Sequence, residues 1–309
     1  TFAEIKDGET AMLWTGIMAN AKNLSPDVAK LIFVFALIGF GTKAGLAPTH
    51  TWLPDVHAQG PAPISALLSG VLLKCAMLAL FRYYAIAAQA TGMEFVQSVM
   101  IISGLITLFV GGIFLVRQHD VKRMFAYHSI VHMGVIAFAL GVGGPLGLFA
   151  AIFHCLAHSF TKALAFCSTG NIARIYGHKD MTKMGGMVKI APITTMMFGA
   201  AVCSLVGVPA FAIFVSEYNV FVGAINSGQY FSTALFAIAL AIIFIADFSH
   251  FNMASFGEPK AAVVHNKEMS IVENLPLILL CALIIIFGVW HVENFYALVN
   301  EGVKIMMGV

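Results

Sequence analysis

Residues 99–116 read VMIISGLITLFVGGIFLV, a run without a single charged side chain. An α-helix needs about 20 predominantly apolar residues to cross a hydrocarbon core of about 30 Å. This run therefore predicts a transmembrane helix. Three further runs have the same character and lead to the same prediction: LIFVFALIGF at 31–40, FSTALFAIALAIIFIA at 231–246 and LPLILLCALIIIFGVW at 275–290.

The composition of the whole chain is that of a membrane protein. Of its 309 residues, 60% are hydrophobic and 10% are charged, against about 25% charged in an ordinary soluble domain. Backbone groups in lipid must be paired within the protein, which leaves helices and closed barrels. Because the runs do not alternate as barrel strands do, we predict an all-α, polytopic transmembrane helix bundle. The formal net charge of +2 gives no basic face for nucleic acid.

The chain divides into a polar extramembrane segment, residues 1–27, and a transmembrane bundle, residues 28–309. The polar segment opens on TFAEIKDGET without an initiating methionine, so we expect the bundle to be incomplete at its N-terminus. The five cysteines lie in apolar stretches without CxxC pairing, which predicts free thiols and no metal site. About eight spans are expected, beginning near Val28, Ala62, Ser98, Met124, Leu146, Ile190, Phe231 and Ile271.

Glycine and proline interrupt two of these spans. Residues 38–55 read IGFGTKAGLAPTHTWLPD and residues 204–217 read SLVGVPAFAIFVSE, and each break is followed by a second apolar half. Paired broken helices are typical of transporters built from inverted repeats, with the site at the unwound segments. Transmembrane helices also tolerate Gly and Pro for packing reasons alone. We predict two discontinuous helices related as inverted repeats, because each break carries a charge, Lys43 or Glu217.

The basic residues between spans indicate an orientation. With each broken helix counted as one crossing, most of them fall in loops on one side, which the positive-inside bias makes cytoplasmic. These residues are Arg117, Lys122, Arg123, Arg174, Lys179, Lys183, Lys189, Lys260 and Lys267.

Charged side chains inside the apolar segments are the candidate functional residues. Each costs at least about 2.5 kcal/mol at the bilayer centre, so a transport role is the first hypothesis. Lys43 lies at the first break, Lys74 in the middle of a span and Glu217 after the second break. A further lysine, Lys162, follows His154 at i+8, with His158 between them at i+4. This spacing places all three side chains on one helix face.

A row of lysines and histidines predicts a proton relay. A buried lysine can gain or lose its charge when a partner charge moves, and histidine links such sites because it titrates near neutral pH. Other interpretations stay open: Lys74 could extend to the interface, and the histidines could be interhelical hydrogen-bond partners. We predict accessory roles for Asp55, His57, His128 and His132, and structural roles for Asp247 and His250 at the end of a span.

Haem ligation by two histidines is an alternative from a different functional class. His128, His132, His154 and His158 could supply the two axial ligands of a membrane cytochrome. A lysine on the same face as two of these histidines argues against that interpretation. The chain also lacks a CxxCH attachment motif.

Four segments resemble a known family. They are GTKAGLAPTHTWLPDVHAQGPAPISALLSGVLLK at 41–74, RQHDVKRMFAYHSIVHMG at 117–134, HCLAHSFTKALAF at 154–166 and FVSEYNVF at 214–221. Together they are similar to the antiporter-like subunits of respiratory complex I, of Mrp sodium/proton antiporters and of energy-converting hydrogenases. The sequence of these segments is most similar to that of hydrogenase-4 component F, and the resemblance runs from about Val28 to Gly228.

The resemblance implies a proton-translocating subunit with no active site, cofactor or redox centre of its own. Electron transfer elsewhere in a hydrogenase or complex I-like assembly would drive it, its partners would be other membrane subunits, and the membrane would be the inner membrane of a prokaryote. A sodium/proton antiporter subunit of the Mrp type is the alternative. The matching relay residues are Lys43, Lys74, His154, His158, Lys162 and Glu217.

The chain departs from the family pattern in three places. The family's glutamate that pairs with the lysine matching Lys43 lies on a helix earlier than any residue of this sequence. Ala212 stands in the second break where a glycine is expected. The long lateral helix near the family's C-terminus is not evident.

Overall fold

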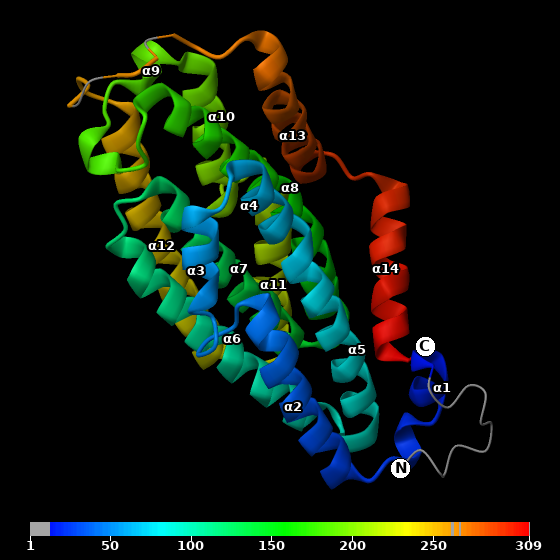
Figure 1. Cartoon of the computed structure of the whole chain (residues 1–309). Helices are drawn as coiled ribbons and strands as arrows, with labels where there is room; N and C mark the ends of the chain where they lie inside the picture. Colours follow the sequence, from blue (N-terminus) through cyan, green and yellow to red (C-terminus); the bar gives the residue numbers. More distant parts are fainter. Residues whose placement is uncertain (1–12, 261–262, 266, 309) are drawn as a thin grey trace.

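The computed structural model describes residues 13–260, 263–265 and 267–308, and within them the chain is a bundle of helices (Figure 1). One isolated bridge, Asp120 to Asp180, is the only β-type pairing in that part of the chain. The elements are α1 (Trp14–Ala19), η2 (Ala21–Asn23), α2 (Pro26–Ala44), α3 (Trp52–Gln59), α4 (Ala62–Leu67), η3 (Leu68–Leu72), α5 (Leu73–Thr91), α6 (Met93–Val116), α7 (Val121–Val142), α8 (Gly144–Tyr176), η4 (Met181–Lys183), α9 (Met187–Ile190), α10 (Pro192–Leu205), α11 (Ala212–Asn226), α12 (Tyr230–Ser255), α13 (Ile271–Val289) and α14 (Glu293–Met307).

The helices agree with the predicted all-α membrane bundle. Six of those described are long and apolar enough to cross a membrane: residues 62–91, 93–116, 121–142, 144–176, 230–255 and 271–289. The two remaining predicted spans are the broken helices, α2 with α3 and α10 with α11. The sequence did not indicate α14, which packs against α5 and α8. A division at residue 27 stays a prediction, since residues 1–12 lie outside the described part.

The first break is a left-handed turn at the end of α2. Gly45 has φ +85°, and a Cβ there would lie 2.6 Å from the Leu53 side chain. The Trp52 indole donates a hydrogen bond of 2.7 Å to the Thr42 carbonyl. A residue with a side chain would clash at Gly45, and the indole holds α3 against the end of α2.

The second break uses two left-handed residues, Gly207 and Ala210. Their φ angles are +68° and +86°, and Ala210 is the only non-glycine residue with positive φ in the described chain. The expected glycine position, Ala212, is instead the first residue of α11. Both predicted breaks are therefore present. Their relation as inverted repeats stays a prediction.

The central pair of helices, α6 and α7, approaches closely through glycine. A Cβ at Gly134 would lie 2.9 Å from the Leu108 nitrogen and 3.0 Å from the Gly104 carbonyl oxygen. Small residues allow such close contact between transmembrane helices, where dispersion rather than the hydrophobic effect supplies the attraction. Most of α7 is consequently buried, and its side chains are available for interior sites.

The loops 117–120, 177–186 and 256–260 meet at one end of the bundle, which we call the basic end. Val121 N donates to Lys179 O at 2.9 Å, Met181 N to His119 O at 2.7 Å, and Gly186 N to Phe256 O at 3.1 Å. In the second loop, hydrogen bonds from Thr182 hold the pKa of the Asp180 carboxyl below its usual value. The prediction that these loops share one side is confirmed.

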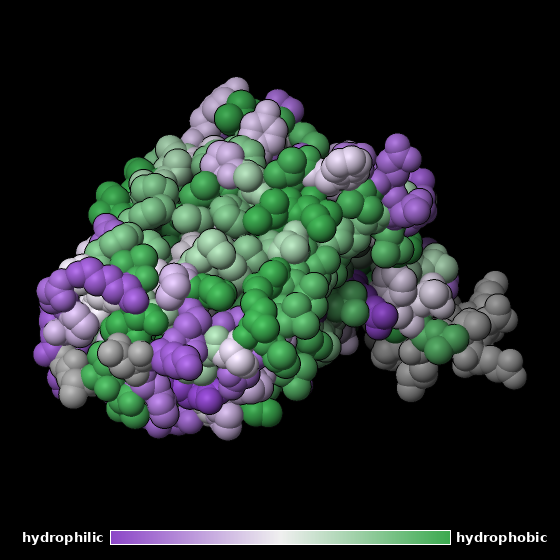
Figure 2. Space-filling model, turned by 90° about the horizontal axis from the view of Figure 1, so that it is seen from above, coloured by the Kyte–Doolittle hydropathy of each residue, from purple (hydrophilic) through white to green (hydrophobic). Residues whose placement is uncertain are grey.

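The outer surface is strongly apolar. Figure 2, seen from above, shows hydrophobic side chains over much of the visible surface and hydrophilic ones gathered in patches. Phe231 and Ile245 of α12 are 79% and 69% exposed, and Val272 of α13 is 74% exposed. Such contiguous exposed apolar surface is far more than a soluble monomer carries. The chain is a multi-pass membrane protein.

Candidate functional site

The long helix α8 runs through the interior and carries the predicted histidine and lysine row. His154, His158 and Lys162 are each 0% exposed. Their spacing of four residues stacks them along one face of α8, as the sequence predicts. The side chains and carbonyls that these three groups contact come from three other elements, α5, α7 and α11, so each has a different set of contacts.

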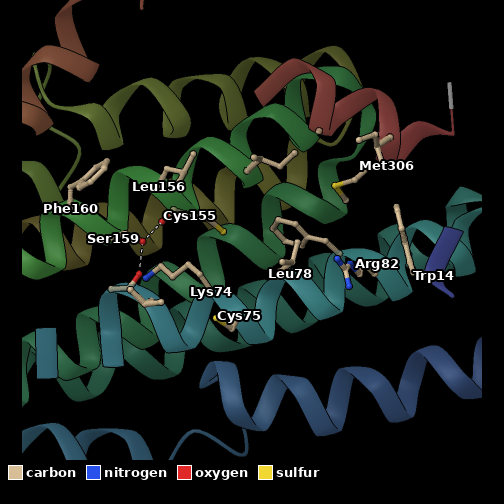
Figure 3. Close-up of a pocket in the computed structure, with 16 residues that line it drawn as sticks. Trp14, Lys74, Cys75, Leu78, Arg82, Cys155, Leu156, Ser159, Phe160 and Met306 are labelled. Carbon is tan, nitrogen blue, oxygen red and sulfur yellow. Dashed lines mark hydrogen bonds between the residues drawn. The ribbon is translucent and has the colours of Figure 1, made fainter. Parts of the chain in front are cut away.

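Lys74 meets this row from α5, immediately after the π-helical turn η3. A π turn shifts the backbone hydrogen-bond pattern and leaves carbonyls available at functional sites. The Lys74 ammonium donates to the Ser69 carbonyl at 2.5 Å, and the Ser159 hydroxyl donates to the Gly70 carbonyl. The same ammonium contacts Nδ1 of His158. In Figure 3 the Lys74 side chain extends from α5 towards α8, beside Ser159.

An apolar groove of about 690 Å³ between α5, α8 and α14 reaches Lys74. Lys74 is therefore only partly buried by this chain, although the histidines behind it are fully covered. Cys155 and Leu156 line the α8 side of the groove, and Arg82 lies towards its far end (Figure 3).

His132 of α7 is the centre of the histidine cluster. Its Nδ1 lies 2.9 Å from Nε2 of His154, and its ring centroid lies 4.8 Å from that of His158. A third ring, His128, stacks on it at 5.8 Å. Only an accessory role for His132 was predicted from the sequence. Its position four residues after His128 in AYHSIVHMG was the available signal, since that spacing places both rings on one face of α7.

A directional hydrogen-bond chain leads from His132 to α11. The Ser216 hydroxyl donates to the Ile213 carbonyl at 2.7 Å, so it accepts from Nδ1 of His154, 2.8 Å away. Nε2 of His154 must then accept from Nδ1 of His132. These tautomers follow from the hydrogen-bond network rather than from observed hydrogens. The next residue of α11 is Glu217.

Between His158 and His132 the row has no direct hydrogen bond. Lys74 can only donate, so Nδ1 of His158 accepts and its proton lies on Nε2. Nε2 of His158 and Nε2 of His132 both lack a partner in the described chain. At this interruption the protonated Nε2 of His158 is a free donor and the unprotonated Nε2 of His132 is a free acceptor.

Glu217 is buried at the second break, with 6% of its surface exposed. Its Oε1 has no hydrogen-bond partner among the described residues. A Cβ at Gly207 would clash with its carboxylate. The left-handed glycine of the turn therefore leaves the space that the carboxylate fills.

We expect Gly207→Ala to displace the Glu217 carboxylate and to destabilise the protein. The left-handed conformation costs a residue with a Cβ about 1–2 kcal/mol, and the clash with Glu217 adds to this. Thermal unfolding in detergent should show a lower midpoint, and ion transport by the full-length protein should fall. Gly228→Ala is the matched control, because Gly228 also has positive φ but has open space around its Cα. Equal effects of both substitutions would show that backbone strain alone is responsible.

Lys162 does not continue the row towards Glu217. Its ammonium donates to the Phe125 carbonyl at 2.7 Å and lies 5.5 Å and 5.8 Å from the ring centroids of Phe125 and Phe166. Lys162 thus makes no direct hydrogen bond to His154 or His158, and its part in the relay stays a prediction. The contacts run in the order Lys74, His158, His132, His154 and Ser216, and Glu217 follows Ser216 in the sequence of α11.

Three predicted residues lie outside the row. Lys43 and Asp55 are exposed, and Asp55 pairs with Arg123 at the start of α7. His57 is 0% exposed and stacks on Phe166 at 4.9 Å, so it lies near Lys162. The structure does not bring Lys43 to the histidines.

Asp247 and His250, for which structural roles at the end of a span were predicted, are both buried inside the bundle. Asp247 is 0% exposed and His250 is 5% exposed. Oδ2 of Asp247 lies 2.5 Å from Nε2 of His128. The apolar stretch 231–246 hid this site, because a helix that is apolar all round shows no preferred face.

The histidine geometry does not fit the haem alternative. His132 bonds directly to His154, and the rings of the cluster have centroid separations between 4.8 and 6.1 Å. A planar macrocycle would have to separate its two axial ligands. Imidazole rings in such close contact can pass protons from one to the next.

Comparisons with known proteins agree with this arrangement. Residues 11–243 match the family described as NADH:quinone oxidoreductase/Mrp antiporter, TM. The chain belongs to this family. The resemblance predicted from the four sequence motifs is thereby confirmed.

Individual members of the family are also similar. A hydrogenase-4 component F homolog of Methylacidiphilum infernorum is 35% identical over 256 residues, which are 83% of this chain and 54% of that protein. A Na⁺/H⁺ antiporter subunit of Alkalihalophilus pseudofirmus is 32% identical over 268 residues, 84% and 53% of the two chains. This chain thus spans about half the length of these relatives.

The fold matches solved members as well. A chain in the Mrp complex of a Dietzia species superimposes with a TM-score of 0.82 at 18% identity, covering 97% of this chain and 66% of that one. At this identity the likeness concerns the fold alone. The broken helices and the central histidine cluster therefore lie in an architecture that other membrane complexes share.

Proposed function

We propose that this chain translocates protons as an antiporter-like subunit of a redox-driven membrane complex of the hydrogenase or NADH dehydrogenase type. The observation that carries the proposal is the row of polar side chains in contact from Lys74 through three histidines to Ser216, with the buried Glu217 as the next residue of α11. Burying such groups in a membrane is costly, and an ordinary packing role does not require them. Proton transfer accounts for their number, their contacts and their order.

In this mechanism a proton reaches Lys74 and passes through His158 and His132 to His154. The step between the two free Nε2 atoms occurs directly or through one bridging water. The Ser216 hydroxyl, which both accepts and donates, turns from the Ile213 carbonyl and relays the proton through a bridging water to Glu217 at the second break. Each imidazole takes up a proton on one nitrogen and releases one from the other, so the row returns to its starting charge.

Electrostatic switching would couple the row to its parent complex. A charge brought near Lys74 changes the balance between its ammonium and its neutral amine, which sets when it releases a proton to His158. The partly open position of Lys74 on the groove is compatible with such an influence. The proposed source of that charge is a neighbouring membrane subunit or another protein segment that faces the exposed Lys43.

The orientation follows from the basic end. If the positive-inside bias applies, the loops 117–120, 177–186 and 256–260 face the cytoplasm of a prokaryote and the chain lies in the inner membrane. Protons would then enter from the side of these loops. Release would occur past Glu217.

The transported ion distinguishes this proposal from a sodium/proton antiporter of the Mrp type. We expect the full-length protein, reconstituted with its complex in proteoliposomes, to generate a pH gradient equally well in sodium-containing and sodium-free buffer. A lysine-histidine row exchanges protons and has few oxygen ligands for a hard cation. The measurement is the signal of an enclosed pH dye, together with uptake of radioactive sodium. Proton movement that requires sodium, accompanied by sodium uptake, would favour the antiporter and contradict the proposal.

A further inference from the structure

The relay leaves one buried carboxylate unused. Asp247 of α12 is 0% exposed, and it is the only carboxylate in the described chain that is fully covered. Its Oδ2 lies 2.5 Å from Nε2 of His128 in an ion-pair contact, and neither of its oxygens has a hydrogen-bond partner of good geometry among the described residues. A carboxylate buried at this depth is expensive, and the one imidazole beside it leaves its hydrogen-bonding capacity unfilled.

The Asp247–His128 pair connects inward to the relay. The ring of His128 stacks on that of His132 with centroids 5.8 Å apart, and neither ring nitrogen of His128 has a hydrogen-bond partner within the described ranges. His132 lies near the middle of α7, about 16 Å along the helix from its start at Val121. The pair therefore meets the row at its centre rather than at Lys74.

The pair also connects outward to the basic end. His250 lies three residues beyond Asp247 on the same face of α12, and its Nδ1 makes no hydrogen bond to the described part of the chain. Its neighbours include the Gln118 backbone and the His119 side chain, which belong to the loop before α7. Asp247 lies about 12 Å from the end of α12 at Ser255, measured along the helix axis. His250 lies between Asp247 and that end.

A buried positive charge accompanies the pair. Lys162 bonds to the Phe125 carbonyl, and Phe125 packs against His128 at a centroid distance of 6.2 Å. Asp247 interacts electrostatically with this lysine. The position of Lys162 away from the row thus has an explanation, because it balances the carboxylate when that carboxylate is ionised.

We propose that His250, Asp247 and His128 form a second proton branch, which leads from the basic end to His132 and depends on the charge change at Lys74 for onward transfer. Asp247 takes up a proton from the loop side through His250, and the Asp247–His128 pair passes one proton to His132. The pair then regains its original charge, and Lys162 stabilises it between transfers. This inference rests on the proposed relay, because it ends at the centre of that relay.

Substitution of Asp247 tests the branch in the full-length protein within its complex. We expect Asp247→Asn to lower proton translocation about tenfold or more, as for loss of a proton-transfer group, and Asp247→Glu to recover most of the activity. Asp180→Asn is the matched control, because it lies at the basic end outside the branch and asparagine preserves its capping role. Equal loss with Asn and Glu at position 247, with a lowered unfolding midpoint, would overturn the branch in favour of a structural pair.

Sidedness supplies a second, independent measurement. In a background whose five native cysteines are replaced, His250→Cys should react with a membrane-impermeant thiosulfonate added at the basic end only. Labelling from the opposite side, or from neither side, would contradict the branch.

The two proposals can fail separately. If Lys74→Ala stops transport while Asp247→Asn leaves it unchanged, the branch is wrong and the relay stands. If both variants pump normally, the relay itself is wrong, and the branch with it.

Discussion

Lys74→Ala in the full-length protein, assembled in its complex, is expected to abolish proton translocation while electron transfer continues in part. The Lys74 ammonium contacts both the π turn η3 and the histidine row, through the Ser69 carbonyl and Nδ1 of His158. Alanine removes both the positive charge of the ammonium and the proton that Lys74 would pass to His158. The measurement is the pH gradient formed by inverted membrane vesicles, recorded beside the rate of substrate oxidation.

Lys74→Arg separates proton release from charge. Arginine keeps a positive charge but does not lose its proton in proteins, so we expect it to assemble normally and still fail to pump. Lys30→Ala is the control for removal of a lysine, because Lys30 lies near the start of α2, where it forms an ion pair with the exposed Asp27. Full pumping by Lys74→Arg would mean that Lys74 contributes charge alone.

Glu217→Gln is expected to be the second most damaging change. Glutamine fills the same space beside Gly207 but cannot take up and release a proton, so the row would end at Ser216. Loss of a proton-transfer group typically costs 10²- to 10⁴-fold in rate, and we expect transport to fall by about 100-fold. The assay is the same vesicle measurement, with thermal unfolding to verify that the variant is folded.

Glu217→Asp and Glu301→Gln complete this test. Aspartate retains the carboxylate and should support transport, whereas Glu301, an exposed residue of α14 that pairs with Lys304, should tolerate glutamine. Equal activity of glutamate, glutamine and aspartate at position 217 would make the residue structural.

The features that could be predicted from the sequence are those with a local signal. Composition and run length are local, so the membrane bundle and most span starts could be predicted, and the glycines and prolines at 38–55 and 204–217 located both breaks. The spacing of His154, His158 and Lys162 indicated their common face directly. A positive φ at Ala210 and the π turn before Lys74 carry no such local signature and were missed.

The sequence by itself determined that charged and titratable groups are buried in an apolar helical bundle, because their cost in lipid depends only on their position within long apolar runs. Only the tertiary structure decided which of them touch. The rotation of α7 and α12 about their axes places His132 between His154 and His158 and Asp247 against His128. Long apolar runs give little periodic signal for that rotation, so packing had to fix it, against α8 for α7 and against α6 for α12.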